Sequence, residues 1–186
     1  EGILDQFQFH QPLVACTLIG LVTGHLKAGI MLGGQLQLYA LGWSNVGAAI
    51  APDAALASTA SAILMALALN GGASNVDQVV STSITLAIPL SVAGLFLTML
   101  ARTLAIPMVH GMDSAAETAD FKKIERIHWS GVAMQGLRIA IPALILCFIP
   151  ASAVTNALNA MPAWLKEGMQ VGGGMVAAVG YAMVLN

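Results

Sequence analysis

The stretch GGQLQLYALGWSNVGAAIAPDAALAS, residues 33–58, places polar side chains within an otherwise apolar run. Its amides and its single carboxylate belong to Gln35, Gln37, Asn45 and Asp53, and Ser44 adds a hydroxyl. Polar groups in hydrocarbon are costly unless they face a protein interior or water, so they indicate a functional site. Amides with one carboxylate and no metal-binding cluster suit a neutral polyhydroxylated ligand such as a sugar.

The same stretch also predicts the type of fold. Residues 28–52 are long enough to cross a bilayer, which takes about 20 residues. The run is nevertheless interrupted by residues that break helices, namely Gly33, Gly34, Gly42, Gly47 and Pro52. Such interrupted segments are typical of transporters whose binding sites are built from discontinuous helices. The alternative is an ordinary kinked span whose small residues allow close helix packing.

Composition places the whole chain in a membrane. The 186 residues are 58% hydrophobic and only 9% charged, with a mean hydropathy of +0.82. An average soluble domain is roughly 25% charged. The sequence therefore predicts an all-α, polytopic integral membrane protein. No basic patch with interleaved aromatic residues occurs in it, so nucleic acid is not expected as a ligand.

The flanking apolar runs outline the remaining helices. Residues 12–24 form a run that is too short to span the bilayer. Pro52 and Asp53 open a helix over 54–69, because proline suits the first turn and an acid is favoured at the positive end of the helix dipole. Both ends of the chain look cut, since it opens without Met and stops inside an apolar run.

Two clear spans follow, at 84–109 and at 130–150, the first with a kink expected at Pro89. Residues 151–168 form an interfacial segment with Trp164 and Lys166 as anchors, and a further span begins at 169.

Residues 110–128 form the most strongly charged stretch, and they predict an amphipathic surface helix. This connection has three basic residues, whereas the connection at 70–83 has none and that at 150–168 has one. The positive-inside rule places 110–128 in the cytoplasm.

A second polar motif, LDQFQFHQP, occupies residues 4–12. Its alternation of polar and aromatic residues predicts an extended or irregular segment, which a membrane protein tolerates only inside protein or beside water. Gln8 and His10 are candidates for sugar contacts, and an interfacial loop is the alternative. His10 as a phosphorylated residue is the less favoured interpretation. The sequence contains no paired-histidine zinc motif, and we expect no metal, cofactor or catalytic residue.

Arg138 lies in the middle of the span at 130–150, where a charge needs a partner or water. We expect it to pair with Asp53 or Asp5, or to face another subunit. The alternative is a tilted helix from which Arg138 reaches the interface.

Three strings in the chain resemble one family. They are LDQFQFHQPLVACTLIGLVTG (4–24), the stretch at 33–58 quoted above, and GYAMVLN (180–186). Together they closely resemble the IIC component of the mannose-type bacterial phosphotransferase system, the mannose–fructose–sorbose family. The similarity covers essentially all of 1–186 as one membrane domain, and it corresponds to the central part of IIC with some of each end missing.

The resemblance implies partners and a mechanism. IIC pairs with a second membrane subunit, IID, and the pairs assemble with threefold symmetry in the bacterial plasma membrane. They translocate a hexose that arrives as its 6-phosphate, while cytoplasmic IIA and IIB proteins carry the phosphate on their own histidines. The sugar is held in a mobile core that moves against a scaffold. Some members also serve as docking targets for antibacterial peptides.

The resemblance also assigns site residues. It places sugar contacts at Gln8, His10, Gln35, Gln37, Asn45 and Asp53. Many relatives have an acid at the position of Gln37, so the resemblance leaves open which sugar hydroxyl this amide contacts. Two alternatives to a group-translocating permease remain: an ion-coupled secondary sugar transporter, and a membrane scaffold that does not transport.

Overall fold

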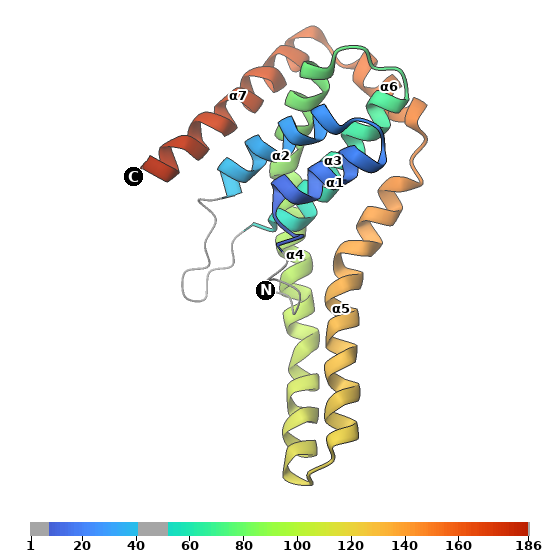
Figure 1. The fold of residues 1–186 in the computed structure, drawn as a ribbon, viewed down its shortest axis with the longest axis vertical. Helices are drawn as coiled ribbons and strands as arrows, with labels where there is room; N and C mark the ends of the chain where they lie inside the picture. The colour runs from blue at the N-terminus through green and yellow to red at the C-terminus, as the bar shows by residue number, and fades with distance from the viewer. Residues whose placement is uncertain (1–7, 41–51, 186) are drawn as a thin grey trace.

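The computed structural model of the chain describes residues 8–40 and 52–185, without the side chains of residues 176, 177, 183 and 184. Within these ranges the regular secondary structure is α-helical. Figure 1 shows α4 and α5 side by side as an extended hairpin, while the other helices gather around one end of α4. We call these other helices the head. The helices are α1 (Pro12–Val22), α2 (Leu26–Ala40), α3 (Ala54–Asn70), α4 (Val76–Glu117), α5 (Phe121–Cys147), α6 (Ala151–Ala160) and α7 (Ala163–Leu185).

Helices α1 and α2 form a closely packed pair. Pro12 occupies the first turn of α1, where its missing N–H leaves no hydrogen bond unmade. The connection to α2 turns at Gly24, whose φ of +82° suits glycine. A Cβ at Gly29 would lie 2.5 Å from the carbonyl oxygen of Cys16 and 3.0 Å from the Cα of Gly20. Small residues thus let the two backbones touch, as in many membrane helix pairs.

Helix α3 supplies much of the buried core. Met65 on α3 is fully buried together with Leu32 of α2 and Ile84 of α4. The hydroxyl of Ser61, also fully buried, donates to the carbonyl of Ala57 at 2.6 Å. Because its small polar side chains bond to their own helix, α3 packs closely on its neighbours without leaving these hydroxyls unsatisfied.

Helices α6 and α7 pack on the rest of the head through contacts with backbone atoms. The Thr155 hydroxyl on α6 donates to the carbonyl of Ala68 on α3 at 3.3 Å. The Thr85 hydroxyl on α4 donates to the carbonyl of Met169 on α7 at 2.8 Å. A Cβ at Gly180 would meet the backbone of α2 at 2.6 Å. Glycine and hydroxyl residues therefore set how closely α6 and α7 approach the rest of the head.

In the described part of the chain, two helices are long and apolar enough to cross a membrane, and they form this hairpin. Helix α4 has 42 residues, which corresponds to about 63 Å, and it continues through Pro89 and Pro107. Within the described chain, no residue of α5 is buried. The spans predicted at 84–109 and 130–150 lie in α4 and α5, and the second extends three residues past α5. The exposed apolar surface of α5 fits lipid or a neighbouring membrane subunit.

Residues 110–128 form the tip of this hairpin instead of the single surface helix that we expected. Helix α4 ends at Glu117, and a turn that contains Ala119 at φ +52° leads into α5. Asp120 then caps α5 by accepting the Lys123 N–H at 3.1 Å. The cytoplasmic location of this segment stays a prediction.

Replacing Gly29 by alanine should destabilise the protein more than replacing Gly34. The methyl group at position 29 meets the Cys16 carbonyl, so α1 must shift, at a cost of about 1–3 kcal/mol. A Cβ at Gly34 meets no described atom within 4 Å, and alanine is the better helix former. Thermal unfolding of the full-length protein in detergent compares the two variants. Equal melting temperatures would show that α1 and α2 do not pack as closely as described.

The position of the hairpin tip can be measured by labelling. Lys122 is exposed. Within residues 1–186, a Lys122→Cys variant made in a Cys147→Ser background has one other cysteine, Cys16, which is fully buried. A membrane-impermeant maleimide should label inside-out vesicles and leave intact cells unlabelled. Labelling of intact cells would place the tip outside the cytoplasm.

Candidate functional site

The polar residues before α1 form a tight turn. Gln8 has a φ of +57°, in the left-handed region, and its carbonyl accepts the N–H of Gln11 at 3.0 Å. Gln11 occupies the N-cap position of α1, directly before Pro12. The irregular backbone predicted for 4–12 is present from residue 8 onward, and residues 4–7 lie outside the described ranges. The turn brings His10 and Gln11 to the start of α1.

A chain of polar side chains links this turn to α2. Gln37 Nε2 donates to Gln11 Oε1 at 2.8 Å, and Gln11 Nε2 lies 3.3 Å from His10 Nε2. Gln37 Oε1 accepts the N–H of Leu13 at 3.3 Å, which satisfies one of the unpaired donors in the first turn of α1. We call His10, Gln11 and Gln37 the amide cluster. All three residues are half-buried, so a ligand can reach them.

The other predicted residues near this cluster are less closely connected to it. Gln35 is half-buried on α2, but it lies two positions from Gln37 and so points to a different side of the helix. Gln8 is exposed in the turn before α1. Asn45, with its neighbour Ser44, lies outside the described residues. Of the six predicted residues, His10 and Gln37 lie in one hydrogen-bonded cluster, which Gln11 links.

Asp53 belongs to a second cluster, which also contains Thr98 of α4 and Arg138 of α5. As the N-cap of α3, Asp53 accepts the Leu56 N–H through Oδ1 at 3.0 Å. Its Oδ2 accepts a hydrogen bond from the Thr98 hydroxyl at 3.2 Å and forms an ion pair with Arg138 Nη1. We call Asp53, Thr98 and Arg138 the ionic cluster. The predicted pairing of Arg138 with Asp53 is confirmed, and the other candidate acid, Asp5, lies outside the described residues.

A close backbone approach makes this cluster possible. A Cβ at Gly94 would lie 2.5 Å from the Cβ of Asp53, so glycine leaves the space that the start of α3 occupies. The Asp53 N–H also donates to the carbonyl of Ser91 at 3.0 Å. These contacts hold the first turn of α3 against α4, and Arg138 reaches the same carboxylate from α5.

The ionic cluster is largely shielded from solvent. The side chains of Arg138 and Asp53 are 18% and 8% exposed. The attraction between the two opposite charges offsets the cost of placing each of them among membrane helices. The buried Nε of Arg138 has no hydrogen-bond partner among the described residues.

Sequence reasoning did not find Thr98 or Gly94, and it placed Gln11 in a motif without assigning it a role. Threonine and glycine are ordinary residues in an apolar membrane helix, so neither carries a local signal. Gln11 pairs with Gln37 across a gap of 26 positions, and no spacing rule within one helix covers that distance.

The amide cluster suits recognition of a ligand, whereas the ionic cluster has a structural role. Among residues 8–40 and 52–185, no group of three His, Cys, Asp or Glu side chains could hold a metal ion. The amide cluster offers both donors and acceptors without net charge, which matches a neutral polar ligand. The ionic cluster ties the start of α3 to α4 and α5.

Removing one charge of the ionic cluster should destabilise the protein more than removing both. An Arg138→Met variant leaves Asp53 charged and shielded, at a cost of about 3–5 kcal/mol. The double variant Asp53→Asn with Arg138→Met should recover most of this loss, because asparagine still caps the helix. Thermal unfolding of the full-length protein measures the stability of the single and the double variant. The matched control is Arg102→Met, which removes an exposed arginine from α4. An Arg138→Met variant as stable as the control would contradict the proposed role of this shielded ion pair.

Comparison with known proteins identifies the family. The family model for the sorbose-specific IIC component of the phosphotransferase system matches residues 1–186. The sorbose-specific IIC component of Klebsiella pneumoniae is 48% identical over 186 residues, which are 100% of this chain and 67% of that protein. The mannose-specific IIC component of Escherichia coli K12 is 47% identical over the same shares of both chains.

A solved structure supports the same assignment. A chain in the cryo-EM structure of the mannose transporter ManYZ with microcin E492 is 47% identical, with a TM-score of 0.70 over 99% of this chain and 71% of that one. The predicted all-α membrane fold and the predicted family are both confirmed. The chain belongs to the IIC permease components of mannose–fructose–sorbose-type phosphotransferase systems, which are multi-pass transport subunits of the bacterial inner membrane.

Proposed function

We propose that this chain binds a hexose of the mannose or glucose type and passes it across the membrane for phosphorylation by cytoplasmic IIA and IIB proteins. The observation that carries the proposal is the amide cluster, in which Gln37 and Gln11 bond to each other beside His10. Among membrane helices, half-buried amides of this kind are expected where a polar ligand replaces water. Membership of the family supports a transport role. The identity of the sugar and the involvement of IIA and IIB are what we propose in addition.

The chemistry of the amide cluster fits a sugar. A hexose is neutral, so its hydroxyls need several directional partners and no strong charge. Each hydrogen bond contributes about 1 kcal/mol net. Four or five of them, together with apolar contact, give binding near the micromolar range, about −8 kcal/mol. Binding of this strength still allows release on the other side of the membrane.

The proposed sugar contacts remain Gln8, His10, Gln35, Gln37, Asn45 and Asp53. Asp53 differs from the others because it also caps α3 and pairs with Arg138. Its carboxylate is held in place before any ligand arrives, so we place it at the edge of the site. Loss of Asp53 would remove a helix cap, an ion pair and a sugar contact together, which makes it a poor single test of binding.

We also propose that the chain works with the membrane subunit IID, in a trimer of IIC–IID pairs. The exposed apolar surface along α5 supports a membrane neighbour, since no residue of this helix is buried within the described chain. The structure of the ManYZ relative contains microcin E492. We therefore include the docking of an antibacterial peptide in the proposal for this chain. A core that moves against a scaffold remains a prediction.

Two alternatives make different predictions. An ion-coupled secondary transporter would deliver unmodified sugar in response to a proton gradient. A scaffold that does not transport would assemble with its partner and bind no sugar.

Replacing Gln37 by leucine should weaken hexose uptake without disturbing the ionic cluster. The variant loses the bonds to Gln11 and Leu13 and one or two sugar contacts, so we expect a five- to tenfold rise in the apparent KM, from about 1 kcal/mol per hydrogen bond. Uptake of radiolabelled mannose in cells that carry the complete system, with the intracellular product identified, measures this. The product should be sugar 6-phosphate.

The matched control is Gln135→Leu, which removes an exposed amide from α5. Equal uptake by the Gln37→Leu variant and the control would show that the sugar binds elsewhere. Accumulation of free sugar driven by a proton gradient would instead favour the secondary transporter.

A further inference from the structure

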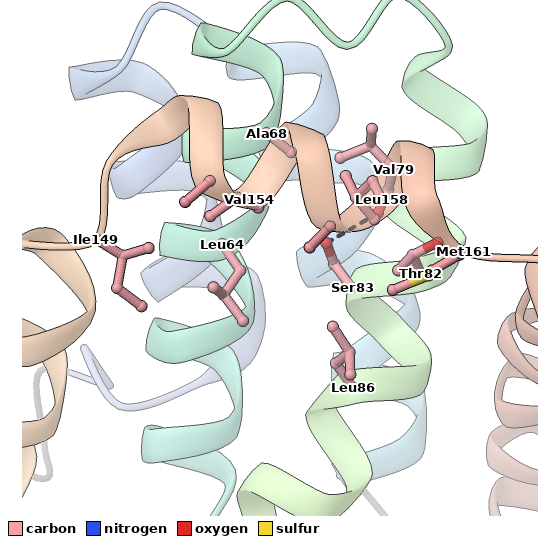
Figure 2. A pocket seen from close by; sticks show the side chains of 12 residues that line it. Leu64, Ala68, Val79, Thr82, Ser83, Leu86, Ile149, Val154, Leu158 and Met161 are labelled. Carbon is pink, nitrogen blue, oxygen red and sulfur yellow. Dashed lines mark hydrogen bonds between the residues drawn. The ribbon is translucent and has the colours of Figure 1, made fainter.

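An apolar cavity of about 260 Å³ lies between α3, α4 and α6, and none of its lining residues belongs to the amide or ionic cluster. Figure 2 shows that its walls come mostly from the three helices, with Leu64 on α3, Leu86 on α4 and Val154 on α6 among them. The hydroxyl of Ser83 in the wall donates to the Val79 carbonyl at 2.8 Å. With that hydroxyl already bonded, the cavity suits a hydrocarbon ligand.

A polar mouth adjoins this cavity. A second hollow of about 100 Å³ shares three lining residues with the first, Val79, Thr82 and Leu158. Its remaining lining is mostly polar and includes Asn75, Gln78, Asn159 and Lys166. The Lys166 ammonium donates to the backbone carbonyl of Asn159 at 3.2 Å. An ammonium has three N–H donors, so this contact fixes the charge at the mouth and leaves capacity for an anion.

The mouth has features of a membrane surface. Trp164, in the same first turn of α7 as Lys166, is 72% exposed, and this pair is typical of the headgroup level. The mouth also lies at the N-terminal end of α4, whereas the charged hairpin tip lies at the other end (Figure 1). The two ends of the 42-residue helix are about 63 Å apart, more than the thickness of a bilayer.

We propose that this cavity binds one anionic phospholipid, with an acyl chain between α3, α4 and α6 and the phosphate at Lys166. The apolar cavity and the basic, amide-rich mouth match the two parts of such a lipid. Two acids adjoin the mouth in sequence, Asp77 and Glu167, but neither is among its lining residues. The lining of the mouth therefore contains no carboxylate that would repel a phosphate.

Native mass spectrometry of the full-length protein, purified with its membrane partner, tests this site. Phosphatidylglycerol is the anionic probe and phosphatidylcholine the zwitterionic one. Lys166→Gln should weaken retention of phosphatidylglycerol about fivefold and leave phosphatidylcholine unchanged. Lys123→Gln at the hairpin tip is the matched control and should retain both lipids as the wild type does.

A second variant and a crosslink test the cavity itself. Ala157→Trp, at an exposed position of α6 that lines the cavity, should fill it and abolish retention of phosphatidylglycerol. A photoreactive residue in place of Leu86 should form an adduct with lipid. The proposal would be overturned if Lys166→Gln retained phosphatidylglycerol as well as the wild type does. It would also be overturned if Ala157→Trp bound phosphatidylglycerol unchanged, or if the photoreactive residue formed its adduct with protein.

Discussion

A carboxylate and a guanidinium that meet among apolar helices impose the strongest constraint on this fold. Asp53 and Arg138 lie 85 positions apart in sequence and on different helices, yet neither charge is tolerable in hydrocarbon without the other. Their meeting requires the start of α3 to lie against α4, where Gly94 leaves the necessary space. It also requires α5 to approach α3 from the hairpin. The pair therefore ties the start of α3, and with it the head, to both helices of the hairpin.

The rest of the head follows a different physical rule. Its helices are held together by small residues and by hydroxyls that bond to backbone carbonyls, as at Gly29 and Thr155. Lipid offers little hydrophobic driving force between helices, so such close contacts provide much of the packing energy. The amide cluster lies on α2 and on the turn before α1, and the packing of α1 on α2 brings these two parts together. A binding site built in this way is placed by backbone contacts and needs no charged anchor of its own.

Features that depend on local signals could be predicted from the sequence. The start of α3 follows from a proline and an acid in succession, and the hairpin helices follow from long apolar runs. The partner of Arg138 could be narrowed to two acids because a charge in a span requires one. The hairpin turn within 110–128, the bond between Gln11 and Gln37, and the cavity beside α6 depend on contacts between distant segments. Propensity and periodicity contain no information about such contacts, so those features required the structure.

The central claim is that Arg138 holds the first turn of α3 in place. Hydrogen–deuterium exchange on the full-length protein in lipid nanodiscs, comparing wild type with Arg138→Met, measures this directly. Exchange should rise at the amides from Leu56 to Ala60, since their helix loses its tie to the hairpin. It should stay unchanged at the start of α4, where the Asn75 cap is independent of Arg138. Identical exchange at the start of α3 in both proteins would contradict the claim and would mean that backbone packing alone positions this helix.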